Sequence, residues 1–457
     1  MDEILAVALA DRKADPRAIC CAKAMVLSRL VEPRSKKAVW ESVSQSIEIP
    51  GVDGQGLPLC SYYRTLEYLS AAKNKIEKAI HGRLTNLFNQ DVSLVFYDLT
   101  SAYFEGRHCA MAKHGYSREH RPDLVQIEIG ILVDAEGLPI GHEVFDGNLK
   151  DVTTVLGTLK RLHDDFGVRR CVFIGDDGMA SEANLAEVNS RGYEYITSLA
   201  MGKSKIALKL LADAPRLRDW TRVSETLWVQ EFASVDGVRY IGTYNPDRAA
   251  SSREHRKARL RKCIEFLRRL QAGPKPRGRN RTLDESFAAA DRCLVQKGCA
   301  EMIRLERRAD SLGWTLEMDA LRKACRMDGI SILKTNSMSL SDQEVARGYR
   351  TLWRVEDAFR HIKDGIGLRP IRHWNDSRVL GHVFVCVLAY TLERLYEREL
   401  QRAGLDLTAR SAIDQLRSIV VATLEAGDRS VRRRSEITRR QRQILDAAGV
   451  KEVPEIW

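Results

Sequence analysis

The sequence of 457 residues has no uninterrupted apolar run of about 18 residues, the length that a membrane-spanning helix requires. Its first residues, MDEILAVALADRKADPR, lack the basic start and the long apolar stretch of a secretion signal. None of the ten cysteines forms a Cys-x-x-Cys pair, which argues against a zinc site. We therefore expect a cytoplasmic protein without a membrane segment, whose cysteines are free thiols.

Acidic residues are too few to balance the basic ones, because 62 Asp and Glu stand against 73 Lys and Arg, a formal net charge of +11. The basic excess is local. Residues 251–282 hold twelve Lys and Arg against two Glu, and a second basic run lies at 429–442. A charge run is often only a solvated surface, but two runs of one sign in a basic chain favour a polyanionic partner such as nucleic acid.

The apolar pattern changes along the first half of the chain. Residues 1–88 have the 3.6-residue period of helices and predict a helical region that binds DNA if the protein binds nucleic acid. Residues 89–202 then alternate short apolar runs with helical patterns in the order β-β-β-α-β-α-β. This order predicts a mixed sheet of five strands with flanking helices, in which DAEG at 134–137 joins a hairpin and the last two strands run parallel to the first.

The second half interrupts and then resumes this pattern. Residues 203–327 contain strand-like pieces and a very basic helix, and we interpret them as an inserted domain. The core resumes at 328–400, where a Ser-x-x-Glu capping box at Ser341 begins another helix. Residues 401–457 are helical and basic. The sequence thus predicts an α/β fold with helical regions at both ends, divided into segments 1–88, 89–202, 203–327, 328–400 and 401–457.

Three carboxylates lie where this topology would bring them together. Asp98 interrupts the apolar strand LVFYDLT, where an uncompensated charge is costly, so it needs a partner or a metal ion. Asp176 ends the strand CVFIGDD, whose carboxyl end lies beside that of the first strand. Glu356 lies in the helix YRTLWRVEDAFRHIK, seven residues from both Tyr349 and Lys363 and therefore on their face.

The combination of these acids indicates a chemistry that each alone would not. A single Asp or Glu of this kind is more often a helix cap, a turn residue or half of an ion pair. Three carboxylates without His or Cys suit Mg²⁺ or Mn²⁺. Two such ions about 3.5 to 4 Å apart can activate an attacking oxygen and stabilise a leaving one at phosphorus, so we predict phosphodiester chemistry.

Five stretches of the sequence resemble the DDE transposases of bacterial insertion sequences, which have an RNase H-like fold. They are VFYDLTSAYFEG, HGYSREHRPDLVQIEIGILVDAEGLPIGHEVFDGN, FIGDDGMAS, DGISILKTN and YRTLWRVEDAFRHIKDGIGLRPIRHW. The branch with an inserted domain carries a helix signature of Tyr, two residues, Arg, three residues, Glu, six residues and Lys. The sequence matches it at Tyr349, Glu356 and Lys363 but has Leu352 in place of the Arg.

The resemblance implies roles for these residues. Asp98, Asp176 and Glu356 would be the catalytic triad and would bind two ions of Mg²⁺ or Mn²⁺. The neighbouring Asp177 competes for the second place, but the family pattern of Asp, any residue, Gly and Met selects Asp176.

The same resemblance implies contacts with DNA. Lys363 would hold a terminal phosphate, and Tyr349 would bind near the cut strand. Trp353 would stack on an unpaired base, with a buried role between helix and sheet as the alternative. The other basic residues that we expect at the DNA are Arg354, Arg256, Lys257 and Arg261. The long connection 100–124 either borders the site and contacts DNA or is a plain surface loop, and the sequence leaves both open.

The resemblance implies a transposase that cuts double-stranded DNA at the inverted repeats of a mobile element and joins the freed 3′-hydroxyl to target DNA. Such proteins work as homodimers on DNA, here in the bacterial cytoplasm at the nucleoid. Two alternatives stay open. A non-catalytic or domesticated DNA-binding protein would need the basic segments without the triad. Another RNase H-like nuclease, such as a junction resolvase, would share the acids without needing the insertion.

Overall fold

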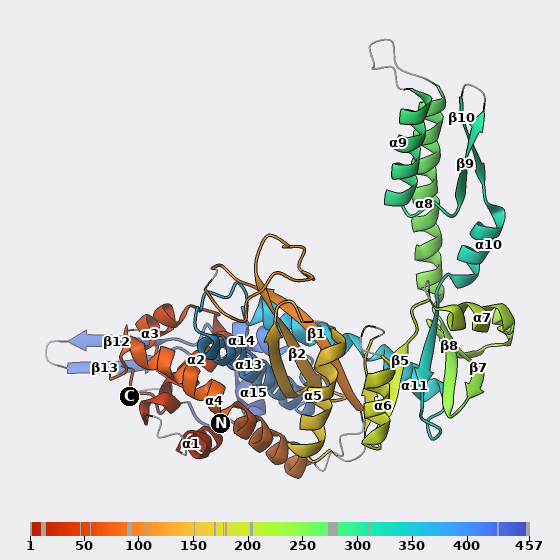
Figure 1. The fold of residues 1–457 in the computed structure, drawn as a ribbon. Coiled ribbons are helices and arrows are strands. Elements are labelled where there is room, and N and C mark those ends of the chain that lie inside the picture. Colours follow the sequence, from red (N-terminus) through yellow and green to blue (C-terminus); the bar gives the residue numbers. More distant parts are fainter. Residues whose placement is uncertain are drawn as a thin grey trace. The chain divides into compact units, whose positions relative to one another are not determined.

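The protein is described by a computed structural model (Figure 1). The residues that it describes are 2–10, 15–45, 47–54, 56–88, 94–106, 108–149, 151–168, 171–176, 178, 181–201, 204–272, 282–308, 311–426 and 429–453. They fall into two compact units, a core unit of Met1–Tyr195 with Arg350–Trp457 and an insertion unit of Ile196–Tyr349. Each unit is described by itself. The finer division into five segments stays a prediction.

The sheet of the core unit follows the predicted order of strands. Its strands are β1 (Leu94–Tyr103), β2 (Gln126–Val133), β3 (Pro139–Asp146) and β4 (Val172–Ile174). The spatial order is β3-β2-β1-β4, with β2 antiparallel to both β1 and β3 and with β4 parallel to β1. Next to β4 begins β5 (Glu194–Ser198), where the Glu194 N–H donates to the carbonyl of Cys171. This mixed arrangement confirms the predicted α/β fold with a mixed sheet and flanking helices, but the sheet continues beyond β5 and has nine strands instead of the predicted five.

Two helices complete the first part of the core. They are α5 (Asp151–Asp164) and α6 (Glu182–Ser190), at the two helical places of the predicted order β-β-β-α-β-α-β. The apolar stripe of α5, with Val155 and Leu159, is buried against strand residues that include Tyr97 and Phe173. Ser181 caps α6 by accepting a hydrogen bond from the Asn184 N–H. The crossover helices thus cover β1, which contains Asp98, and β4, which Asp176 follows.

Helices from the two ends of the chain form one layer of the core unit. The N-terminal ones are α1 (Asp2–Ala10), α2 (Arg17–Val31), α3 (Lys36–Gln45) and α4 (Leu59–Phe88), and they pack around α13 (Asp376–Arg402). A Cβ atom on Gly381 of α13 would lie 2.1 Å from the Leu66 carbonyl oxygen, so α4 and α13 approach as closely as backbone allows.

The apolar character of α13 comes from its place in the core. Among the described residues it is the one helix long and apolar enough to cross a membrane, judged by length and composition. However, 67% of its most apolar window is buried inside the fold. Burial of this kind accounts for the apolar composition without a membrane.

A buried charge network ties α4 to the sheet. Glu77 of α4 accepts from His142 Nδ1 at 2.6 Å and lies 2.7 Å from Arg161 of α5, and Lys73 is 3.5 Å away. Burial alone would raise the pKa of Glu77, but the charge and hydrogen bond of His142 and the two other cations lower it to about 2. The N-terminal helices are therefore fixed to β3 by ionic contacts as well as by apolar packing.

The insertion unit contains a group of antiparallel strands and, apart from it, two helices packed on a hairpin. Its strands β11 (Ile330–Thr335), β8 (Val238–Tyr244), β7 (Leu227–Val235) and β6 (Thr221–Ser224) are antiparallel neighbours in this order, and β11 also pairs with β5. The helices α8 (Pro246–Gln271) and α9 (Leu283–Gln296) lie side by side (Figure 1) and pack on the hairpin of β9 (Ile303–Arg308) and β10 (Ser311–Leu316). The remaining helices are η2 (Leu217–Asp219), α7 (Lys205–Asp213), α10 (Met318–Met327) and α11 (Asp342–Arg350).

The C-terminal region is helical, as predicted, but also contains a hairpin. The helices are α14 (Ala409–Leu416) and α15 (Arg439–Ala447), and the hairpin strands are β12 (Val421–Ala426) and β13 (Arg429–Arg434). The basic run at 429–442 therefore spans β13 and the start of α15. Its basic residues therefore belong to a strand of a hairpin and to the first turn of a helix, and not to one helix.

Candidate active site

Asp98 lies inside β1, directly opposite Ile131 of β2. Its Oδ1 accepts a hydrogen bond from the Leu99 N–H at 2.7 Å. The pKa of Asp98 is raised to about 7, mainly by burial and also by the negative charges of Asp176 and Glu356, whereas the Leu99 hydrogen bond and the charge of Arg118 lower it. This carboxyl group therefore holds a proton much more readily than an ordinary aspartate.

Asp176 lies two residues beyond the end of β4. In the parallel pair, Phe96 of β1 stands opposite Ile174 of β4, so that the same two-residue step leads to Asp98 on one strand and to Asp176 on the other. Their electrostatic coupling agrees with this register. Asp177, the competing acid, lies outside the described residues.

Glu356 lies in α12 (Trp353–Arg360), with its side chain exposed. Its charge acts on Asp98, so all three acids named from the sequence influence one carboxyl group. Among the described residues, however, no group of three His, Cys, Asp or Glu side chains is close enough to hold a metal ion. The carboxylates are neighbours, then, but do not have the spacing of a formed metal site.

The donor set nevertheless fits a divalent cation. Carboxylate oxygens are the ligands that Mg²⁺ and Mn²⁺ prefer, and the mutual repulsion that raises the pKa of Asp98 is what a cation would relieve.

The segment 349–363, which contains Glu356, is not one continuous helix. The predicted alignment of Tyr349, Glu356 and Lys363 on a single helix face is therefore wrong. α11 ends at Arg350, α12 starts at Trp353, and the π-helical turn η3 (His361–Gly365) follows it. The capping box at Ser341 is present, with Glu344 bonded to the Ser341 N–H. Because a π turn holds one residue more than an α turn, Lys363 leaves the face of Glu356.

Lys363 is held by an acid from the connection between β1 and β2. Its Nζ lies 2.6 Å from Glu119 Oε1, and Arg369 contacts the other oxygen of Glu119. Arg118, the preceding residue, lies 2.6 Å from Glu128 Oε2, and its charge lowers the pKa of Asp98. The connection therefore borders the site, and the plain-surface alternative does not hold for its Ser-Arg-Glu-His segment.

These two charged residues were missed in the sequence. The signal for them was the charge of SREH at 117–120, but nothing local showed which distant groups it would meet.

A family model described as a transposase DDE domain matches residues 52–392, most of the chain. The chain belongs to this transposase family. A comparison with curated proteins found no match. Among solved structures, piggyBac transposase in a synaptic complex with hairpin DNA, determined by cryo-EM, is similar at a TM-score of 0.43 and 10% identity, over 87% of this chain and 69% of that one. That likeness is too weak to support an argument about this transposase.

Trp353, at the start of α12, is 56% exposed, so it does not pack between helix and sheet. With Arg354 it lines a cavity of about 260 Å³ that also includes Asp357 and Tyr390. An exposed indole beside an arginine is compatible with the contact to an unpaired base that we predicted for the transposase.

The basic helix α8 of the transposase presents only part of its charge to solvent. Arg256 is 8% exposed, and its guanidinium bonds both oxygens of Asp328, at 2.7 and 2.5 Å. This favours a structural role for Arg256 over the predicted contact with DNA. Lys257, which pairs with Glu254, and Arg261 are both exposed.

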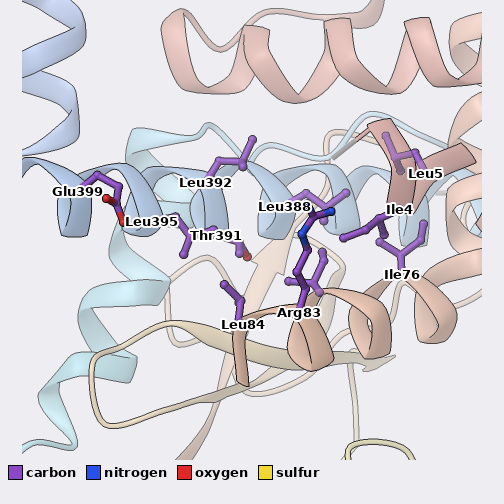
Figure 2. A pocket seen from close by; sticks show the side chains of 11 residues that line it. Ile4, Leu5, Ile76, Arg83, Leu84, Leu388, Thr391, Leu392, Leu395 and Glu399 are labelled. Carbon is purple, nitrogen blue, oxygen red and sulfur yellow. The ribbon is translucent and has the colours of Figure 1, made fainter. Parts of the chain in front are cut away.

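A further cavity, of about 300 Å³, is apolar (Figure 2), and Asp98, Asp176 and Glu356 are not among its lining residues. It is enclosed by α1, α4 and α13, and Leu5, Ile76 and Leu388 line it. Its lining is mostly aliphatic, which suits packing of the helical layer and not phosphodiester chemistry.

Proposed function

We propose that Asp98, Asp176 and Glu356 are the catalytic carboxylates with which this transposase cuts and joins DNA. The observation that carries the proposal is the parallel register of β1 and β4, which brings Asp98 and Asp176 to matching positions. The charges of Asp176 and of Glu356 on α12 both raise the pKa of Asp98, which supports their proximity. These acids come from β1, from the residues after β4 and from α12. Because their charges repel one another, they do not stabilise the fold as an ion pair would, and this favours a metal-binding role.

The three carboxylates would hold Mg²⁺ or Mn²⁺, as two ions. When bound, such ions activate the attacking oxygen and stabilise the leaving oxygen of a phosphodiester. In the first step a water oxygen would bond to phosphorus and lose a proton while the bond from phosphorus to the 3′-oxygen breaks. The products are a 3′-hydroxyl, which takes up a proton, and a 5′-phosphate. In the second step the 3′-hydroxyl would lose its proton, bond to a phosphorus of the target DNA and displace the target strand's own 3′-oxygen, which leaves as a hydroxyl.

The DNA partner would be double-stranded DNA with the inverted repeats of an element, followed by target DNA. The exposed cations of α8, among them Lys257 and Arg261, and the run at 429–442 support this by their charge. Tyr349, Trp353, Arg354 and Lys363 would contact the strand near the cut. We expect a homodimer on DNA, in the cytoplasm at the nucleoid.

The experiment is cleavage of plasmid DNA that carries the sequences flanking the gene, with Mg²⁺ and then Mn²⁺. Asp98→Asn, Asp176→Asn and Glu356→Gln should each slow strand cutting by at least about 100-fold, since each removes a metal ligand. The matched control is Glu187→Gln, an acid of α6 that pairs with Arg191 and is outside the site, which should cut within threefold of the wild type.

The same assay distinguishes the proposed transposase from a non-catalytic DNA-binding protein and from another RNase H-like nuclease. If Asp98→Asn cuts as fast as the wild type, the assignment of the triad is wrong. A wild-type protein that binds the ends but never cuts them would be a domesticated DNA-binding protein. Cutting of branched DNA without joining would indicate a different RNase H-like nuclease.

A further inference from the structure

A hollow in the core unit is lined by cations and aromatic rings. It consists of two adjoining cavities, of about 350 Å³ and about 410 Å³, whose linings share Tyr63, Arg372 and His373. We call it the basic groove and define it by Arg29, Lys36, Tyr63, Arg372, His373 and Trp374. Among the described residues, no Asp or Glu lines either cavity.

Lys36 is the innermost cation of the basic groove and is only 4% exposed. Its Nζ lies 2.8 Å from His382 Nδ1, and His382 Nε2 lies 3.0 Å from the Leu368 carbonyl oxygen. Nε2 must therefore carry the hydrogen and donate to Leu368, which leaves Nδ1 to accept from Lys36. The amino group of Lys36 thus has a neutral partner, whereas the charged form of a buried lysine is stable mainly beside an anion.

Arg29, next to Lys36, is also buried, at 8% exposed. Its guanidinium donates to the carbonyl oxygens of Ile366 and Gly367, at 3.1 and 2.7 Å. Burial and the nearby charge of Arg29 lower the pKa of Lys36 well below its ordinary value. An anion in the basic groove would stabilise the positive charge of both side chains better than the three neutral acceptors that they now contact.

The rim of the basic groove offers rings and exchangeable cations. Trp374 is 69% exposed, and Arg378 lies over the ring of Tyr63, 5.6 Å from its centre. Arg372 pairs with Glu105 at 2.9 Å, and both side chains are largely exposed, so a phosphate can replace this acid at little cost. Arg369, at the edge of the groove, contacts the same Glu119 that holds Lys363, which links the groove to the active site.

We propose that the basic groove binds an unpaired segment of a DNA strand, with a phosphate against Lys36 and Arg29 and a base on Trp374. Cations that track phosphates together with exposed rings are how proteins hold single strands. In an intact duplex the bases are paired and stacked inside, so no base is available to stack on Trp374. This inference rests on the proposed function for its substrate, DNA, but uses none of the three catalytic carboxylates.

The test is fluorescence anisotropy with the full-length protein and labelled 12-nucleotide oligothymidylate, beside a 12-base-pair duplex of arbitrary sequence. Divalent ions are absent, so that the result does not depend on cutting. Trp374→Ala should weaken binding of the single strand about tenfold and leave binding of the duplex within twofold. Lys36→Met should also weaken single-strand binding about tenfold, whereas the matched control Lys37→Met, at its exposed neighbour, should stay within twofold.

The outcomes are distinct. If Trp374→Ala and Lys36→Met both bind the single strand like the wild type, the proposal is wrong. If each weakens the duplex as much as the single strand, the groove is a surface for duplex phosphates and the unpaired segment is refuted. Should Lys36→Met lose its circular dichroism signal, Arg372→Gln at the exposed rim replaces it under the same criterion. A failure of the cleavage experiment would leave these binding results unaffected.

Discussion

Lys363 Nζ lies 2.6 Å from Glu119 Oε1, and the two side chains are 11% and 4% exposed. The lysine that the family resemblance assigns to a terminal phosphate is thus already neutralised by a carboxylate of its own chain. Burial lowers the pKa of Lys363, and the contact with Glu119 partly restores it. A DNA phosphate at Lys363 would have to take the place of Glu119 or share the lysine with it.

We predict that Glu119→Gln strengthens binding to duplex DNA and makes it more sensitive to salt. The change leaves Lys363 without its acid and Arg369 with Asp364 alone, so that Lys363 becomes available to phosphate, which adds about 0.9 to the slope of log affinity against log salt for each new contact. The free protein should lose about 3 to 5 kcal/mol of stability, because the buried Lys363 loses its partner.

Salt titrations of duplex binding and urea unfolding measure the two effects. Glu187→Gln, which removes half of an i,i+4 pair with Arg191, is the matched control and should change neither by much. An unchanged salt slope in Glu119→Gln would show that Lys363 does not reach DNA.

The pKa of Asp98, about 7, predicts that metal affinity depends on pH. Below pH 7 a divalent ion must displace the proton of Asp98, so affinity should rise with pH through 7 and level off above about 8. Titration calorimetry of Mn²⁺ in two buffers of different ionisation enthalpy would measure the proton released. Asp98→Asn should abolish this release, and a release that persists in that variant would assign it to another group.

The same shift predicts a pH effect on stability without metal. The folded pKa of Asp98 lies above its unfolded value of 3.8, so its contribution is full below pH 3.8 and is lost as pH rises through 7. At pH 8 in EDTA, Asp98→Asn should therefore be more stable than the wild type by about 1 to 3 kcal/mol.

Thermal unfolding at pH 5 and pH 8 checks this sign. The advantage of Asp98→Asn should shrink at pH 5, where the wild type is protonated too. Excess Mn²⁺ should stabilise the wild type more than the variant, because only the former keeps all three ligands. A variant less stable than the wild type at pH 8 in EDTA would contradict the pKa of about 7.

The parts of the fold that the sequence predicted are those set by local periodicity. The apolar runs of β1 to β3 and the neighbouring positions of Asp98 and Asp176 follow from chain order and parallel pairing alone, although β1 continues past Asp98 to Tyr103. The break between α11 and α12 was not predictable, because the helical period continues through it. Nor was the contact of Glu119 with Lys363, since charged residues 244 positions apart in the numbering carry no local signal of their pairing.

Glu77 gives the last prediction, on the attachment of the N-terminal helices. Its folded pKa of about 2 lies below the ordinary 4.5, so its stabilising contribution is present above pH 4.5 and is lost as pH falls toward 2. Glu77→Gln should cost about 3 to 5 kcal/mol at pH 7, because it leaves Arg161 and Lys73 buried beside one acid fewer. Urea unfolding at pH 7 measures this, with the exposed Glu41→Gln as the control that should change stability by less than about 0.5 kcal/mol. The difference between Glu77→Gln and the wild type should narrow below pH 4.5, and a constant difference down to pH 3 would mean that the network stabilises the fold by packing and not by charge.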